Sequence, residues 1–291
     1  MQWTVLADNR TQNPSLLTEH GLSILLETDK HRILLDTGAS DVFIRNAETL
    51  GLDLSTVDYV FISHGHSDHA GGLKHFMEIN TQAQVIVSPH AMSGKFFSKR
   101  GNLHSITTEW PEIPQERLLK VEHSGSIGDD IFILAHIPQI HPMPEGNQHL
   151  FIEKSDGSYV HDDFRHELAL YTDGLLFTGC AHSGLVNILA ACPYPVKAVL
   201  GGFHLLDGME SEEELIALGK RLLNYGNSSP IKFPSPFGEG LGVRLGPLFF
   251  TSHCTGDIVF ATLKTVMGDH LHAFSCGTSL SLQYNQRCAF V

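Results

Sequence analysis

A short segment in the first quarter of the chain carries four side chains that can bind metal ions. Residues 64–69 read His-Gly-His-Ser-Asp-His and supply three imidazoles and one carboxylate. Imidazole nitrogens suit zinc, iron or manganese, and a carboxylate oxygen widens that choice without fixing it. The residue types therefore indicate chemistry that depends on a metal ion.

The surrounding residues predict a turn from a strand into a helix. Residues 59–62 are β-branched or aromatic, and Gly71 and Gly72 lead into apolar residues with helical spacing. His64 and His66 are two residues apart on an extended segment and can reach one ion. Asp68 and His69, at the start of the helix, can face the position of a second ion. The spacing favours two metals over one. The alternative, a solvated turn rich in histidine, needs several coincidences of residue type and offset.

The pattern His-x-His-x-Asp-His resembles the signature of the metallo-β-lactamase superfamily of metallohydrolases. The resemblance implies an α/β protein with the αβ/βα four-layer sandwich of that superfamily. It also implies a site for one or two divalent metal ions at one edge, with a metal-bound hydroxide as nucleophile. Zinc is the first expectation for the metal, and manganese or iron are the alternatives.

Composition narrows the class of protein and of partner. The length of 291 residues fits one large α/β domain or two small ones, and a hydrophobic content of 42% is ordinary for a globular protein. The formal net charge of −13 argues against binding along a nucleic-acid backbone. We expect a small-molecule substrate, no nucleic-acid or membrane partner, and leave a homo-oligomer open. The N-terminal residues do not resemble a signal peptide, and no apolar window is long enough to cross a membrane. Five cysteines without paired spacing predict reduced thiols in a cytoplasmic protein.

Apolar patterning predicts the elements that must position these ligands. An antiparallel meander is expected first, followed by alternating helices and strands. The expected strands are 3–7, 21–27, 31–38, 57–63, 84–88, 131–134, 167–171, 175–177, 196–200 and 248–251, and the expected helices are 40–50, 69–80, 185–191, 215–223 and 257–267. Within a single domain of residues 1–291, the segment 91–165 is expected to form an insertion or lid, and 226–247 a Pro/Gly-rich loop.

Four of the expected strands are followed directly by residues that can bind a metal. These residues are His64, Cys180 with His182, His204, and His253. Strand ends at one edge of a sheet converge in space, and ligands commonly bind at that edge. A single histidine after a strand is more often a packing residue, but four such strand ends in one chain favour a shared site.

Further candidates remain open on the residues alone. His90, His136 and His141 could reach the site, although a surface role or a supporting role is the simpler interpretation. Asp36, in the sequence Asp-Thr-Gly, could face the site from a strand end or cap a helix that begins near residue 40. The superfamily resemblance implies the first role, in which this aspartate supports the ligand turn.

These residues suggest a division into two metal positions. His64, His66 and His182 would hold the first ion, and a second set would hold the other. That second set is Asp68, His69 and His253, with Cys180 near or between the two ions. Asp68 could also orient the hydroxide. His204 is a further ligand or a group that handles substrate or protons, so Asp68 and His204 are the expected catalytic residues. The alternative for Cys180 is a small buried hydrophobic residue.

The likeness to a particular subfamily spans nearly the whole chain, beginning at Asp8-Asn9 and His20-Gly21-Leu22-Ser23. Three motifs carry it. They are Thr-Gly-Cys-Ala-His-Ser-Gly at 178–184, Gly-Gly-Phe-His at 201–204 and Ser-His-Cys-Thr-Gly at 252–256. They resemble the dihydropterin-ribofuranosylaminobenzene-phosphate synthase subfamily, in which the implied reaction is a C–N condensation of a dihydropterin diphosphate with an aminobenzene ribotide. Cys180 departs from the superfamily pattern, because many members carry a bridging aspartate there.

The motifs that are missing point to the metals as the source of reactivity. The sequence has neither a Gly-x-Ser-x-Gly nucleophile elbow nor a Gly-x-x-x-x-Gly-Lys phosphate loop. Metal-dependent hydrolysis of a small phosphoester or related anion, resembling a phosphodiesterase, is the first expectation. Lactone or thioester hydrolysis and the pterin condensation are the alternative reactions. Besides a hydrolase and a synthase, the third class of protein to consider is a non-catalytic metal-binding or sensor protein.

Overall fold

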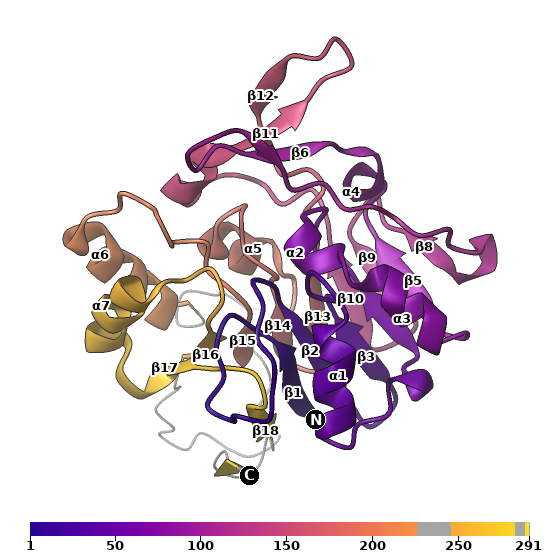
Figure 1. Ribbon diagram of the computed structural model, residues 1–291. Coiled ribbons are helices and arrows are strands. Elements are labelled where there is room, and N and C mark those ends of the chain that lie inside the picture. Colours follow the sequence, from indigo (N-terminus) through magenta and orange to yellow (C-terminus); the bar gives the residue numbers. More distant parts are fainter. Residues whose placement is uncertain (226–245, 283–288, 291) are drawn as a thin grey trace.

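Two large β-sheets pack face to face in the computed structural model, which describes residues 1–225, 246–282 and 289–290 (Figure 1). The first sheet has the strand order β19-β18-β1-β2-β3-β4-β5-β8 and the second β17-β16-β15-β14-β13-β10-β9. The first comprises β1 (Gln2–Ala7), β2 (Ser23–Glu27), β3 (Arg32–Leu35), β4 (Tyr59–Phe61), β5 (Gln84–Val87), β8 (Leu118–Lys120), β18 (Ser279–Ser281) and β19 (Ala289–Phe290). The second comprises β9 (Gly125–Ile127), β10 (Ile131–Leu134), β13 (Ala169–Thr172), β14 (Leu175–Phe177), β15 (Ala198–Leu200), β16 (Leu248–Thr251) and β17 (Leu271–Ala273).

The order of strands follows from the way they are connected. Strands β1, β2 and β3 form the expected antiparallel meander. Strands β3, β4 and β5 are parallel, as are β14, β15, β16 and β17. Parallel neighbours need crossover connections, and helices supply most of them. The carboxyl ends of β4, β14, β15 and β16, where the possible ligands follow, are therefore available to form one site.

Helices cover the outer faces of both sheets. They are α1 (Val42–Thr49), α2 (Ser67–Ala70), α3 (Leu73–Ile79), α4 (Pro89–Ser93), α5 (Leu185–Ala191), α6 (Glu212–Leu223) and α7 (Asp257–Met267), with short 3₁₀ turns η1 (Leu54–Thr56), η2 (Gln115–Arg117), η3 (Glu145–His149) and η4 (Gly268–His270). Phe43 of α1 and Phe76 of α3 pack on the first sheet, and Ile188 of α5 and Leu263 of α7 pack on the second. The αβ/βα four-layer sandwich expected from the sequence is confirmed.

The central core lies between the two sheets. Trp3 of β1 meets Phe250 of β16 at a ring-centroid distance of 5.3 Å, and Phe61 of β4 meets Phe177 of β14 at 6.0 Å. Burying large apolar side chains of this kind stabilises a fold by roughly 1.5–3 kcal/mol each. Phe61 and Phe177 precede ligand-bearing turns, so this packing also holds the two halves of the candidate site together.

A third, four-stranded sheet lies apart from the sandwich, at the top of Figure 1. It has the order β12-β11-β6-β7, formed by β6 (Phe96–Ser98), β7 (His104–Ser105), β11 (Leu150–Glu153) and β12 (Tyr159–His161). We call these four strands, with the turns that join β6 to β7 and β11 to β12, the arm. Of the segment 91–165, only these parts are separate from the sandwich, since β8, β9 and β10 pair within the main sheets. Most of the expected 226–247 loop lies outside the described residues.

The helix expected over 69–80 is divided into α2 and α3 at Gly71 and Gly72. A Cβ atom at Gly72 would lie 2.1 Å from the carbonyl oxygen of Thr37, and one at Gly71 would lie 2.6 Å from that of Ala39. The two glycines thus allow the ligand turn to pack directly on the segment that follows Asp36. Over the described part of the chain, no helix has the length and apolarity to cross a membrane.

Candidate metal centre

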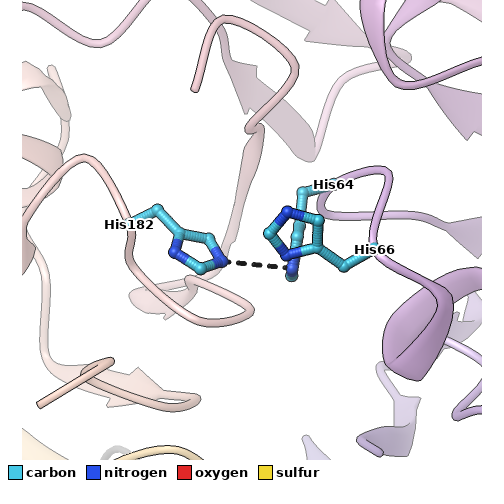
Figure 2. Close-up of side chains that lie close together, drawn as sticks. All are labelled: His64, His66 and His182. Atoms are coloured by element: carbon cyan, nitrogen blue, oxygen red, sulfur yellow. Dashed lines mark hydrogen bonds between the residues drawn. The ribbon is translucent and has the colours of Figure 1, made fainter. Parts of the chain in front are cut away.

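The structure brings together the side chains that follow β4, β14 and β16. Figure 2 shows His64 and His66 facing His182, with Nε2 of His64 and Nε2 of His182 3.3 Å apart. Ligand atoms from these three buried histidines all lie within 4.8 Å of one another. The first of the two groups expected from the sequence is therefore assembled.

The second expected group lies beside the first. Nε2 of His69 and Nε2 of His253 are 3.1 Å apart, and Asp68 Oδ2 lies 3.4 Å from Nε2 of His253. Cys180 Sγ lies 3.1 Å from Nε2 of His69. Because ligand atoms of His64, His69 and Cys180 also lie within 4.8 Å of one another, the two groups form one continuous cluster.

Asp36 determines which ring nitrogens of two histidines carry the proton. Its carboxylate accepts hydrogen bonds from the backbone N–H and the hydroxyl of Ser63, each at 2.7 Å, and lies 2.6 Å from Nδ1 of His69. The Ser63 hydroxyl has given its only hydrogen to Asp36, so it accepts from Nδ1 of His64 at 2.8 Å. Both histidines therefore carry the proton on Nδ1 and present Nε2 to the cluster.

Two asparagines fix the tautomers of the other two histidines, His182 and His253. Asn147 donates from Nδ2 to the carbonyl oxygen of His182 at 2.8 Å, which leaves Oδ1 to accept from Nδ1 of His182 at 3.1 Å. Oδ1 of Asn9 lies 3.0 Å from Nδ1 of His253. In the neutral form of each ring, Nε2 again faces the cluster. Histidines that bind metals are typically held in one tautomer by such an acceptor on the outer nitrogen.

The residues present fit a metal ion. Two neutral imidazoles that face each other with Nε2 lone pairs cannot form a hydrogen bond. A metal cation between His64 and His182, and between His69 and His253 when His253 is neutral, would satisfy both nitrogens of each pair. For a zinc–nitrogen bond of about 2.0–2.1 Å, two ligands of a tetrahedral ion lie roughly 3.3–3.4 Å apart. The observed separations of 3.3 and 3.1 Å are close to this spacing.

The electrostatic environment suits neutral ligands around a positive charge. Burial, together with the neighbouring histidines, holds the pKa of His64 and of His182 well below the usual value, and burial lowers the pKa of His66 to about 3. Burial also opposes protonation of His253, but the hydrogen bond and the negative charge of Asp68 raise its pKa to about 9. The space beside Asp68 thus favours a positive charge, which a proton or a metal ion can supply.

The sequence-based interpretation missed the acidic partner nearest to His66. Nε2 of His66 is buried without a hydrogen-bond partner, and Asp162 Oδ2 lies 4.0 Å away. His166 Nε2 lies 3.0 Å from the same oxygen, and the backbone N–H of Phe164 donates to the other oxygen of Asp162 at 2.8 Å. No local pattern indicated this partner, because it lies almost one hundred residues away in the sequence, in the turn between β12 and β13.

Glu167 is a second group that was missed as a site residue, because it was assigned only to a strand. The buried carboxylate accepts the backbone N–H groups of His182 at 2.6 Å and Ser183 at 2.7 Å, and so fixes the turn between β14 and α5. Burial raises the pKa of Glu167 to about 7, against the effect of these hydrogen bonds. The turn that presents His182 therefore depends on a carboxylate that is costly to bury.

Replacing Glu167 by glutamine is expected to weaken zinc binding by about 10–100-fold. The amide can accept only one of the two bonds well, and changes in outer groups that orient ligands have effects of this size. Competition with a zinc chelator measures the affinity. Glu48→Gln on the exposed side of α1 is the matched control, and an unchanged affinity in Glu167→Gln would contradict the assigned role.

Of the other candidates from the sequence, only His204 and Asp36 lie beside the cluster. His90 and His136 are exposed and lie outside the cluster, and His141 contacts Arg221, with Nδ1 of His141 3.3 Å from Nη1 of that arginine. His204 is buried beside the cluster, at a ring-centroid distance of 4.1 Å from His182. Asp36 does not cap a helix, since the N-cap of α1 is Asp41.

The chain is similar in sequence and in structure to several known proteins. The model of the metallo-beta-lactamase superfamily matches residues 18–154. An uncharacterized protein of Methanocaldococcus jannaschii is 32% identical over 210 residues, which cover 69% of this chain and 78% of that protein. The 7,8-dihydropterin-6-methyl-4-(beta-D-ribofuranosyl)-aminobenzene-5'-phosphate synthase of the same organism is 28% identical over 283 residues, covering 87% of each chain. A crystal structure of a metal-dependent hydrolase of the beta-lactamase superfamily superposes with a TM-score of 0.76 at 28% identity, covering 97% of this chain and 99% of the other.

Proposed function

Since the chain belongs to the metallo-β-lactamase superfamily, we propose that it is a metal-dependent hydrolase acting on a small phosphoester or a related anionic substrate. The observation that carries the proposal is the convergence of four histidine Nε2 atoms in two close pairs, each with its Nδ1 fixed by an acceptor. With both rings neutral, Nε2 of His64 and Nε2 of His182 cannot hydrogen-bond to each other, so this arrangement fits a bound cation.

The proposed ligand sets follow the two pairs. His64, His66 and His182 hold the first ion, and Asp68, His69 and His253 hold the second, with Cys180 placed beside His69. Two bound divalent ions, zinc being the first expectation, would lower the pKa of a coordinated water toward about 7 and neutralise negative charge on the substrate. Asp68 is also the carboxylate best placed to orient the attacking water, since its Oδ2 lies 3.4 Å from His253 and 3.7 Å from His69.

The position of Arg100 is a further argument for an anionic substrate. It extends from the arm, with Nη2 3.4 Å from Nε2 of His204 and Nε 3.4 Å from Asp207 Oδ2, and it is partly exposed. A guanidinium group offers several donors in a plane that matches the oxygens of a phosphate. Arg100 and His204 together would bind the phosphoryl oxygens beside His182. In this role the arm would take part in binding the substrate.

Turnover of bis-nitrophenyl phosphate by the zinc- or manganese-loaded protein tests the proposal. We expect release of nitrophenol that stops when a chelator removes the metal and returns when the metal is restored. A metal-loaded protein that cleaves no phosphoester in a broad panel, yet still binds its ions, would contradict the proposal and favour a metal-binding or sensor protein.

The second candidate function is the pterin condensation. It is favoured by the 28% identity to the methanogen synthase over 87% of both chains. In that reaction the same ions and Arg100 would bind a diphosphate leaving group in place of a phosphoester. Product formation from the dihydropterin diphosphate and the aminobenzene ribotide, in the absence of phosphodiester turnover, would select this function. Hydrolysis of a lactone or thioester is a further alternative, which the same panel covers.

Replacing Arg100 by methionine is expected to raise KM for the phosphodiester by about 10–100-fold, with metal content unchanged. A hydrogen bond to a charged group contributes about 1.5–3 kcal/mol, and methionine keeps most of the side-chain length without the donors. Steady-state kinetics measure the effect, and Arg100→Lys should recover part of it. Lys95→Met, which removes an exposed cation just before β6 that pairs with Glu153, is the control. Equal KM values in Arg100→Met and the wild type would exclude the role.

A further inference from the structure

Next to the histidine cluster, two thiol side chains and one imidazole lie close together. Cys180, His204 and Cys254 follow the neighbouring strands β14, β15 and β16, and all three are buried. The sulfur atoms of Cys180 and Cys254 are 3.3 Å apart, and one ligand atom from each of the three residues lies within 4.8 Å of the others. Cys180 also contacts the histidine cluster, through its position 3.1 Å from Nε2 of His69, and the ring centroid of His204 lies 4.1 Å from that of His182.

The backbone leaves room for the second sulfur. A Cβ atom at Gly202 would lie 2.4 Å from Sγ of Cys254, so any other residue there would displace the thiol. The amide N–H of Gly202 donates to the carbonyl oxygen of Gly179 at 2.6 Å, which holds the two ligand-bearing turns against each other. The glycine before Phe203 in the motif at 201–204 therefore has a steric role at this sulfur pair.

His204 contributes a buried nitrogen that has no nitrogen or oxygen partner. Its Nδ1 makes no hydrogen bond of good geometry, whereas its Nε2 faces Arg100. The residue also has a positive φ of 50°, an unfavourable conformation for a histidine. A buried polar atom without a partner typically costs about 1–3 kcal/mol. A cation held jointly with the two sulfurs would satisfy this nitrogen.

We propose that Cys180, Cys254 and His204 form a sulfur-rich site for a thiophilic divalent cation, distinct from the histidine-rich centre. Two thiolates on one tetrahedral zinc ion lie about 3.8 Å apart for zinc–sulfur bonds of about 2.3 Å, so the two thiols need to separate by only about 0.5 Å. Thiolate ligands select zinc and softer metals over magnesium or calcium. Cys180 lies between this site and the His69–His253 pair and can belong to both.

Titration of the metal-free protein with cobalt(II) chloride tests the proposal without any substrate. Cobalt bound to thiolate gives a sulfur-to-metal charge-transfer absorption, which imidazole and carboxylate ligands do not give. We expect this absorption in the wild type and a fall to about half in Cys254→Ser, because one thiolate in place of two remains. Elemental analysis after loading with zinc should show one equivalent fewer in Cys254→Ser than in the wild type.

Cys192→Ser is the matched control, because Cys192 is also buried but lies at the end of α5, with its thiol near the carbonyl oxygen of Tyr194. It should retain the full absorption and zinc content. Equal absorption in the wild type and Cys254→Ser would overturn the proposal, as would a disulfide between Cys180 and Cys254 in the purified protein. A His66→Ala variant that loses hydrolysis but keeps the sulfur absorption would separate this site from the proposed hydrolase centre.

Discussion

Replacing His66 by alanine is expected to lower phosphodiester turnover by about 10³-fold or more and to remove one equivalent of bound metal. His66 is buried and belongs to the group formed with His64 and His182. Two remaining imidazoles are too few for a stable ion at this position, since catalytic zinc typically has three protein ligands. The loss of an ion that activates water and neutralises charge removes the main source of catalysis.

Elemental analysis and steady-state kinetics on the same preparations measure both effects. His75→Ala on α3 is the control, because His75 is partly exposed and its ion pair is with Glu78 on the same helix. That variant should keep its metal and its turnover. A His66→Ala protein with full metal content and full turnover would show that the group around His182 is not a metal site.

Replacing Asp36 by asparagine is expected to lower the free energy of unfolding by about 3 kcal/mol or more. The buried carboxylate accepts two hydrogen bonds from Ser63 and lies 2.6 Å from Nδ1 of His69. Asparagine has nearly the same shape, but its NH₂ group would face a donor. Each buried donor left without an acceptor costs roughly 1–3 kcal/mol, and more when the lost partner is charged. The expected loss therefore follows from the hydrogen bonds and not from a change in packing volume.

Urea denaturation in the presence of a chelator measures this loss without a contribution from bound metal. The same variant should bind zinc about 10–100-fold more weakly, because His69 and His64 lose the groups that orient them. Asp41→Asn is the control, since the Asp41 side chain pairs with Arg45 at the surface of the same segment. Identical denaturation midpoints for Asp36→Asn and the wild type would rule out the supporting role of Asp36.

The inner part of the candidate site could be predicted from the sequence for a physical reason. His182 and His253 each follow a buried, largely apolar strand of the same sheet, and the strand ends of a sheet meet at one edge. His64 follows β4, a strand of the other sheet, so its approach to them depends on how the two sheets pack. The strand ends and the dense run at 64–69 therefore pointed to these residues, whereas the packing of one sheet on the other has no local pattern in the sequence.

The outer partners could not be predicted in the same way. Asn147 lies in the 3₁₀ turn η3, and Asp162 and Glu167 lie between β12 and β13, where no periodic pattern marks them. Each contacts a histidine or a backbone N–H that belongs to another element. Arg100 was missed for the same reason, since the residues that it meets, His204 and Asp207, lie about one hundred residues later in the chain. Contacts between segments of unrelated pattern become visible only in three dimensions.

The break between α2 and α3 shows a different limit. The apolar spacing after His69 continues across Gly71 and Gly72 and predicts one helix, but the close approach of the carbonyl oxygens of Thr37 and Ala39 divides it. Tertiary contact here overrides the local pattern. The two glycines were visible in the sequence, although the backbone that they accommodate was not.

Anomalous diffraction at the zinc edge, on crystals of the zinc-loaded protein, tests the central claim most directly. Besides the zinc proposed between Cys180 and Cys254, we expect one peak bounded by His64, His66 and His182, and another bounded by Asp68, His69 and His253. Crystals of fully zinc-loaded protein with no anomalous peak at either position, or with zinc only at the molecular surface, would contradict the account.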